Sequence, residues 1–226
     1  MTEITIILLL SVCSLDALCS FCGSQMCIRD RLQGIYDDSI WLIDLVENLL
    51  SISRFDDNNI ELRKEPQLVE ELIEEALGHI THKAVSHDLS VDVEDPLLMA
   101  QVDVTLIVQV LVNIINNAVE YTPEGSTIQI KAFQQGMRVV VRISDNGTGI
   151  PDSDKESVFN MFYTGGNREK GDSRRGMGLG LALCKSIVEA HDGTICVKDN
   201  TPKGAAFEFT LPLVEVKNNE HFNSNR

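Results

Sequence analysis

Three groups of residues have the types and spacing that suit chemistry with cations and phosphates. In the first, Asn113 and Asn117 stand four residues apart in a segment of helical periodicity, so both lie on one helix face, with Asn116 beside them. Side-chain amide oxygens suit Mg²⁺, which takes oxygen ligands and usually keeps waters and ligand phosphates. Paired asparagines on a helix also fit a capping or surface role. The pattern alone leaves both interpretations open.

The second group is the run Asp-Asn-Gly-Thr-Gly-Ile-Pro at residues 145–151, directly after a predicted strand. Gly147 and Gly149 allow the backbone to turn sharply and to approach a ligand closely. A carboxylate at Asp145 accepts a hydrogen bond from an exocyclic amine, which would select adenine over guanine. The alternative is a simple turn at the end of a hairpin, because Asp, Asn and Gly are turn residues.

The third group is Gly-Met-Gly-Leu-Gly-Leu at residues 176–181, which leads directly into a predicted helix. Exposed backbone N–H groups at a helix start suit phosphate. No Gly-Lys-Ser/Thr follows, so this is not a Walker loop, and the strand and later acidic residue of a dinucleotide fingerprint are missing. The run therefore predicts a phosphate-binding loop of another type.

The formal charge of −15 and the pI near 4.6 argue against nucleic-acid binding, which would require a basic face. An acidic protein that binds a polyanion must concentrate positive charge locally. The dense basic cluster of this chain is Arg168, Lys170, Arg174 and Arg175, next to the third group. A solvated loop is the alternative interpretation of that cluster.

Hydrophobic periodicity predicts alternating helices and strands with several strands in succession, which argues against a purely parallel, doubly wound sheet. We expect an α+β fold, a mixed sheet with helices on one face. The predicted helices are 32–55, 68–82, 103–123, capped by Asp103, and 179–190, and the predicted strands are 60–64, 89–93, 127–133, 138–144, 194–197 and 206–211.

The two ends of the chain differ from the rest. We expect residues 1–31 to be a non-native or disordered segment. Their apolar run 4–10 is too short to span a bilayer, and its extension to Cys22 includes Asp16, although a membrane anchor stays an alternative. Cys19 and Cys22 form a lone CxxC pair, which lacks the second ligand pair of a structural zinc site. The polar tail 217–226 is expected to be disordered.

The apolar stripe of helix 32–57 cannot be buried within that helix. It requires a partner helix or a second chain, so we expect a possible homodimer through residues 32–55. Packing of the helix on its own domain is the alternative.

The ordered motifs together resemble the ATP-binding catalytic domain of sensor histidine kinases. Residues 113–123 resemble the asparagine box, 145–151 the first glycine box, 159–162 the phenylalanine box and 176–181 the second glycine box; 207–212 match the usual closing strand. The resemblance covers residues 58–216. Within the superfamily, residues 161–167 and 172–175 are similar to the Kdp-type potassium-uptake sensor kinases.

The resemblance implies a two-layer α/β sandwich that binds ATP and Mg²⁺, with Asn117 as the main metal ligand supported by Asn113. It implies that Tyr121 stacks near the adenine, that Asp145 binds the adenine amine, and that residues 163–177 form a mobile lid. The full ATP-binding set it implies is Asn113, Asn117, Tyr121, Asp145, Gly147, Gly149, Ile150, Phe162, Arg174, Arg175, Gly176, Gly178, Leu179 and Gly180. Glu120 departs from the family, which usually has lysine there, and a carboxylate facing the phosphates would repel them.

The resemblance also implies a phosphoacceptor histidine on the first helix of a two-helix dimerisation hairpin, of which residues 32–57 resemble the second helix. No histidine precedes residue 32, and His87 has only part of the acceptor motif because Ser90 follows. We therefore expect a catalytic module that phosphorylates a histidine outside this fragment. The alternative is a non-catalytic, ATP-dependent interaction module. Implied partners are a histidine-containing dimerisation domain and a response regulator, and the implied location is cytoplasmic, attached in the full-length protein to the inner face of the membrane.

Overall fold

The computed structural model describes residues 39, 46, 62–80, 86–164 and 178–214. The chain divides into two units, residues 1–50 and 51–226. Of the first unit only Ser39 and Val46 are described, and both are helical. The predictions for residues 1–31, for the rest of helix 32–57 and for the tail 217–226 therefore lie outside the described residues.

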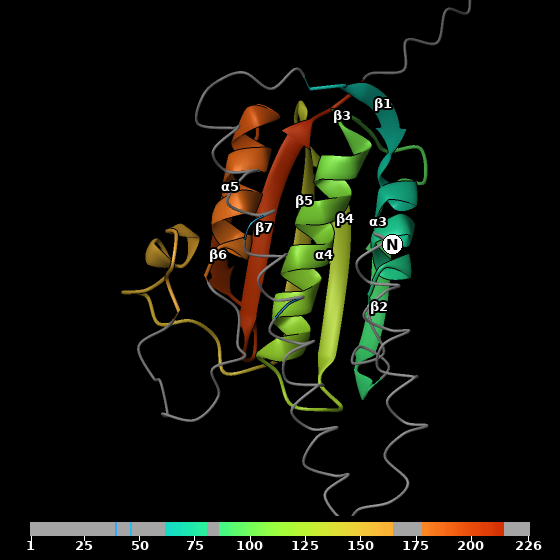
Figure 1. Cartoon of the computed structure of the whole chain (residues 1–226). Coiled ribbons are helices and arrows are strands. Elements are labelled where there is room, and N and C mark those ends of the chain that lie inside the picture. Colours follow the sequence, from blue (N-terminus) through green and yellow to red (C-terminus); the bar gives the residue numbers. More distant parts are fainter. Residues whose placement is uncertain (1–38, 40–45, 47–61, 81–85, 165–177, 215–226) are drawn as a thin grey trace, which may run out of the picture. The chain divides into compact units, whose positions relative to one another are not determined.

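The second unit combines strands and helices, with three pairs of consecutive strands among its described elements (Figure 1). Its elements are β1 (Glu65–Leu68), α3 (Val69–Gly78), β2 (Asp88–Val93), β3 (Met99–Val102), α4 (Val104–Glu120), β4 (Thr127–Gln135), β5 (Arg138–Asp145), the 3-10 helix η2 (Ser157–Phe159), α5 (Gly180–Ala190), β6 (Ile195–Asp199) and β7 (Ala205–Pro212).

Five of these strands form one mixed sheet in the order β2-β4-β5-β7-β6. The β2–β4 pair is parallel and the other neighbouring pairs are antiparallel. Figure 1 shows α3, α4 and α5 in front of the strands, all on the same face of the sheet. The predicted mixed sheet with helices on one face is confirmed.

Helix α4 forms because its sequence combines a cap with a wide apolar stripe. The Asp103 side chain accepts a hydrogen bond from the Leu106 N–H at 3.4 Å, as predicted for the N-cap. The helix ends just before Thr122 and Pro123, where a residue preceding proline disfavours helical backbone. Its buried residues are Ile107, Val108, Val110, Leu111, Ile114, Ile115, Ala118 and Val119.

A buried histidine joins the end of α5 to the start of α4. His191 has no exposed surface; its Nδ1 donates to the Ile187 carbonyl at 2.7 Å and its Nε2 accepts from the Asp103 N–H at 3.0 Å. Because Nδ1 donates and Nε2 accepts, these two bonds fit the neutral ring with its proton on Nδ1. Burial lowers the pKa of His191 below its ordinary value.

The predicted strand at 60–64 is wrong where the structure describes it, because residues 62–64 are irregular and the strand is β1. β1 pairs with β3 as a separate two-stranded sheet, and β3 was not predicted. Proline is tolerated in such an edge strand, so Pro66 does not interrupt it. In the described part of the chain, no helix has the length and apolar character needed to cross a membrane.

Candidate functional site

The centre of the candidate site is the carboxylate of Asp145 at the end of β5. Only 8% of this residue is exposed. Its Oδ1 accepts hydrogen bonds from the backbone N–H of Gly147 at 2.8 Å and of Ala205 at 3.2 Å. Neither of these two bonds uses Oδ2. Within the described residues, that oxygen is left to accept a hydrogen bond from a ligand.

Gly147 brings the glycine turn against the end of α4. A Cβ on Gly147 would lie 2.8 Å from Cγ2 of Thr122, 2.9 Å from Oδ1 of Asp145 and 3.5 Å from the Tyr121 carbonyl oxygen. Only glycine therefore allows the turn to pack this closely. The first glycine motif and the end of the asparagine motif are therefore in contact here.

Two residues that the sequence analysis did not select hold Asp145 from behind. Gly204 has φ +117, and a Cβ there would lie 1.9 Å from the Asp145 carbonyl oxygen. The Asn200 side-chain amide donates to the same oxygen at 2.7 Å. The only sequence signal was the turn composition between β6 and β7, which does not indicate which strand end the turn contacts.

Thr122 forms a polar wall next to the glycine turn. Its Oγ1 donates to the Ala118 carbonyl at 2.6 Å, so the 3.1 Å contact with Nε2 of His87 makes that ring nitrogen the donor. His87, which resembled an acceptor histidine only in part, is half-buried and engaged in this contact. Through Thr122, His87 lies beside the glycine turn.

Helix α5 begins opposite the asparagine face of α4. Asn113 and Asn117 are half-buried, and a Cβ on Gly180 would lie 3.8 Å from Cγ of Asn113. The buried Nδ2 of Asn113 has no hydrogen-bond partner among the described residues, and the thiol of Cys184 beside it is only a weak acceptor. An unpaired buried amide next to a glycine at a helix start fits a site that a ligand completes.

The same amide pair fits Mg²⁺ by its chemistry. Two side-chain amide oxygens are hard ligands that leave positions for waters and phosphates. No cluster of three or more His, Cys, Asp or Glu side chains that could hold a metal occurs in the described ranges. Burial raises the pKa of the nearby Cys184 to about 12, so its thiol stays protonated and is a poor metal ligand.

The phenylalanine motif is fastened to the start of the second glycine motif. The Phe162 N–H donates to the Gly178 carbonyl at 2.9 Å. Gly178 has φ +69, and a Cβ there would lie 2.3 Å from the Tyr163 carbonyl oxygen. Leu179, 1% exposed, then anchors the start of α5 in the core. Arg174, Arg175 and Gly176 lie outside the described residues.

The remaining predicted residues lie around this centre. Gly149 has φ +77 and packs against Gly204, because a Cβ on Gly149 would lie 3.2 Å from the Gly204 carbonyl oxygen. Ile150 is half-buried. Tyr121 and Phe162 are 59% and 61% exposed. Glu120 is exposed at the end of α4, so its carboxylate can point into solvent.

Known proteins resemble this chain in sequence and in fold. Residues 102–215 match the family "Histidine kinase-, DNA gyrase B-, and HSP90-like ATPase". The sensor protein KdpD of Clostridium acetobutylicum is 42% identical over 184 residues, which cover 81% of this chain and 20% of that protein. The chain thus spans about a fifth of the length of this relative.

Solved structures agree with the sequence match. The catalytic domain of histidine kinase ThkA gives a TM-score of 0.59 at 30% identity, over 66% of this chain and 97% of that one. Full-length ShkA, solved in complex with AMPPNP, gives 0.70 at 25% identity, over 85% of this chain and 40% of that one. By its match to the family model and by its relatives, the chain belongs to the histidine kinase-, DNA gyrase B- and HSP90-like ATPase family, with sensor histidine kinases as its relatives.

Proposed function

We propose that this chain binds Mg·ATP between α4, the end of β5 and the start of α5. The observation that carries the proposal is the convergence of four motifs far apart in sequence. Gly180 faces Asn113, Gly147 packs on Thr122, and Phe162 is hydrogen-bonded to Gly178. Simple turns and surface helix faces do not require such contacts with one another.

Each part of the site has a role that its chemistry suits. The free Oδ2 of Asp145 accepts the adenine amine, while the two bonds to Oδ1 fix the direction of the carboxylate. Asn117 and Asn113 hold Mg²⁺, which neutralises phosphate charge when bound. The backbone N–H groups at the start of α5, from Gly178 onward, are suited to the triphosphate. Arg174 and Arg175 supply further positive charge, and Gly149, Ile150 and Tyr121 line the adenine side.

The proposed reaction is transfer of the ATP γ-phosphate to a histidine on a dimerisation domain. This chain contributes positioning and charge stabilisation rather than a covalent intermediate. Its described histidines do not suit the acceptor role: His191 is fully buried, His87 is bonded to Thr122, and the exposed His79 lacks the flanking residues of the acceptor motif. The fragment therefore needs an acceptor domain from another chain or from the full-length protein.

In the full-length protein we propose that this module is cytoplasmic, that residues 32–55 contribute to a dimerisation hairpin, and that a response regulator receives the phosphate. The name of the relative, a sensor protein, supports a role in signal transduction.

Nucleotide binding is the first test. Calorimetric titration with ATP, with and without Mg²⁺, and with GTP as the competing nucleotide, should show selective Mg·ATP binding. Asn117→Ala should abolish the Mg²⁺-dependent part of the affinity. Asn116→Ala is the matched control, because Asn116 is the exposed neighbour on the same helix. Equal Mg·ATP affinity in both variants and the wild type would remove Asn117 from the metal site.

Phosphoryl transfer is the second test. The chain is mixed with Mg·ATP and a separately made dimerisation domain that carries an acceptor histidine. The proposal predicts acid-labile phosphate on that histidine and none on the same domain with the histidine replaced by alanine. Binding of Mg·ATP without any transfer would favour an interaction module over a kinase.

A further inference from the structure

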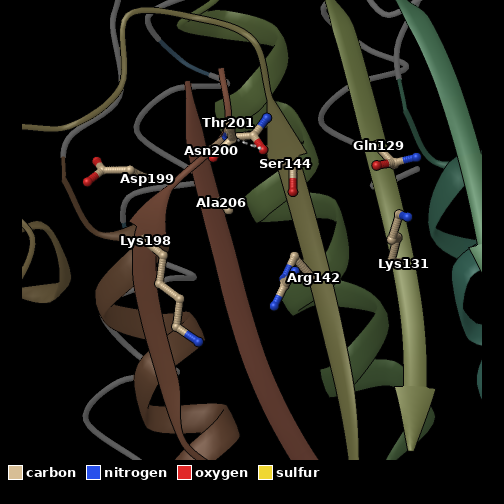
Figure 2. A pocket seen from close by; sticks show the side chains of 9 residues that line it. All are labelled: Gln129, Lys131, Arg142, Ser144, Lys198, Asp199, Asn200, Thr201 and Ala206. Atoms are coloured by element: carbon tan, nitrogen blue, oxygen red, sulfur yellow. Dashed lines mark hydrogen bonds between the residues drawn. The ribbon is translucent and has the colours of Figure 1, made fainter. Parts of the chain in front are cut away.

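The face of the sheet opposite the helices carries a second, polar cavity of about 320 Å³. Figure 2 shows its side chains in front of the strands, with the helices behind them. Its volume is near the lower end of the roughly 300–1,000 Å³ typical of small-molecule pockets. Its lining residues are Gln129, Lys131, Arg142, Ser144, Lys198, Asp199, Asn200, Thr201 and Ala206.

The floor of the cavity is a row of residues in register across four strands. Ser144 is the Cα partner of both Gln129 and Ala206, and Ala206 is the partner of Lys198. Small side chains at the two central positions leave a hollow between the longer ones. The Ser144 hydroxyl and the Gln129 amide have no hydrogen-bond partner within the described part of the chain, so both are available to a ligand.

Positive charge lines this hollow from three strands. Lys131 on β4 is in register with Arg142 on β5, and Lys198 comes from β6. Arg142 donates to Oε2 of Glu208 at 2.6 Å and Lys198 donates to Oε1 at 2.6 Å. The contact of Lys131 with Asp92 is longer, at 3.3 Å, and exposed. Two cations therefore share one carboxylate, and the third is loosely paired.

Glu208 cannot neutralise both of its partners. Burial alone would raise the pKa of Glu208, but the hydrogen bonds from Lys198 and Arg142 outweigh burial, and the pKa is below its ordinary value. Glu208 thus carries one negative charge against two positive ones. The remaining lining carboxylate, Asp199, shares Lys155 with Asp152, at 2.7 Å and 2.5 Å, and points away from the cations in Figure 2.

We propose that this cavity is a binding site for a small phosphate-bearing molecule. A phosphate offers three or more acceptor oxygens and nearly two negative charges, which suits cations from three strands together with a hydroxyl and an amide. A carboxylate offers two oxygens and one charge. The volume leaves room for an organic group beside the phosphate.

The cavity is separate from the nucleotide site but adjoins it through the backbone. Ser144 and Asp145 are consecutive in β5, so their side chains lie on opposite faces of the sheet. Asn200, at the rim of the cavity, donates to the Asp145 carbonyl oxygen at 2.7 Å. The cavity and the Asp145 carboxylate lie on opposite faces of the sheet, so a failure of ATP binding would not by itself refute the second site.

Titration of the full chain with inorganic phosphate, followed by amide chemical shifts in NMR spectra, tests the proposal at residue resolution. Saturable shifts are expected at Ser144, Ala206 and Lys198, and acetate at the same concentration should give none. The Lys131→Gln/Lys198→Gln double variant should weaken phosphate binding at these amides about tenfold or more.

Lys185→Gln is the matched control. Lys185 is 47% exposed and Lys198 54%, each with a carboxylate partner, but Lys185 lies on α5, on the other face of the sheet. The control should bind phosphate as the wild type does. Shifts confined to the start of α5, or an equal loss in the control and the double variant, would overturn the proposal.

Discussion

Replacing Asp145 with asparagine would test the proposed adenine site with little change of shape. In the wild type, Oδ1 accepts from the N–H groups of Gly147 and Ala205, which leaves Oδ2 for the base. An asparagine keeps both bonds only if its carbonyl oxygen takes the Oδ1 position. Its NH₂ group then takes the Oδ2 position and presents a donor to the adenine amine, which is also a donor.

The magnitude follows from this exchange. A hydrogen bond to a charged group contributes about 1.5–3 kcal/mol, and its loss lowers ATP affinity about 10- to 150-fold. Guanine has an acceptor oxygen in place of the amine, so GTP should lose less affinity than ATP or gain some. The two backbone bonds become neutral and cost about 1 kcal/mol of unfolding free energy, so the fold should survive.

The assay is paired calorimetric titration of wild type and Asp145→Asn with Mg·ATP and Mg·GTP, beside urea unfolding of both proteins. The folded variant could instead keep both its ATP affinity and its ratio of ATP to GTP affinity. That result would refute the assignment of Oδ2 to the adenine amine. Loss of both nucleotides together with loss of the fold would instead place the effect in the two backbone bonds.

Four further changes have defined outcomes. Gly204→Ala places a Cβ 1.9 Å from a carbonyl oxygen of Asp145, so thermal unfolding should show a loss of several kcal/mol, on the order of backbone strain plus overpacking. The lowered pKa of His191 means that its contribution to the unfolding free energy is constant above about pH 6.5 and falls as the pH drops below it, by up to about 1.4 kcal/mol per pH unit; His191→Gln should remove this contribution in urea titrations. Glu120→Lys should tighten ATP binding modestly, by about 0.2–1 kcal/mol, as for an exposed charge pair. Weaker ATP binding in this variant would mean that residue 120 does not face the phosphates. Ile114→Ala empties a fully buried position and should cost about 2–5 kcal/mol in urea unfolding.

Features encoded within one segment of the sequence were predictable. The Asp103 cap and the apolar stripe of α4 are local signals, and both appear in the structure. Gly147 and Gly178 belong to recognisable motifs, and their close contacts explain why glycine is needed there.

Features that depend on long-range pairing were not predictable in this way. β3 has only four residues, too few for a clear alternation, and it forms because β1 lies beside it. Asn200 and Gly204 matter only because folding brings their turn to the carbonyl of Asp145. Turn composition marks a change of direction but does not identify the segment that it meets.

The hydrogen bond between Phe162 and Gly178 has a consequence for how this protein can diversify. It joins the two ends of the intervening segment, and the Gly178 backbone packs directly on Tyr163. The entropy of closing a loop grows only with the logarithm of its length, about 0.6 kcal/mol for each doubling. Insertions and deletions between these ends should therefore leave the adenine side in place. Changes in that segment would alter the phosphate contacts proposed for Arg174 and Arg175, while the proposed adenine side around Asp145 keeps its geometry.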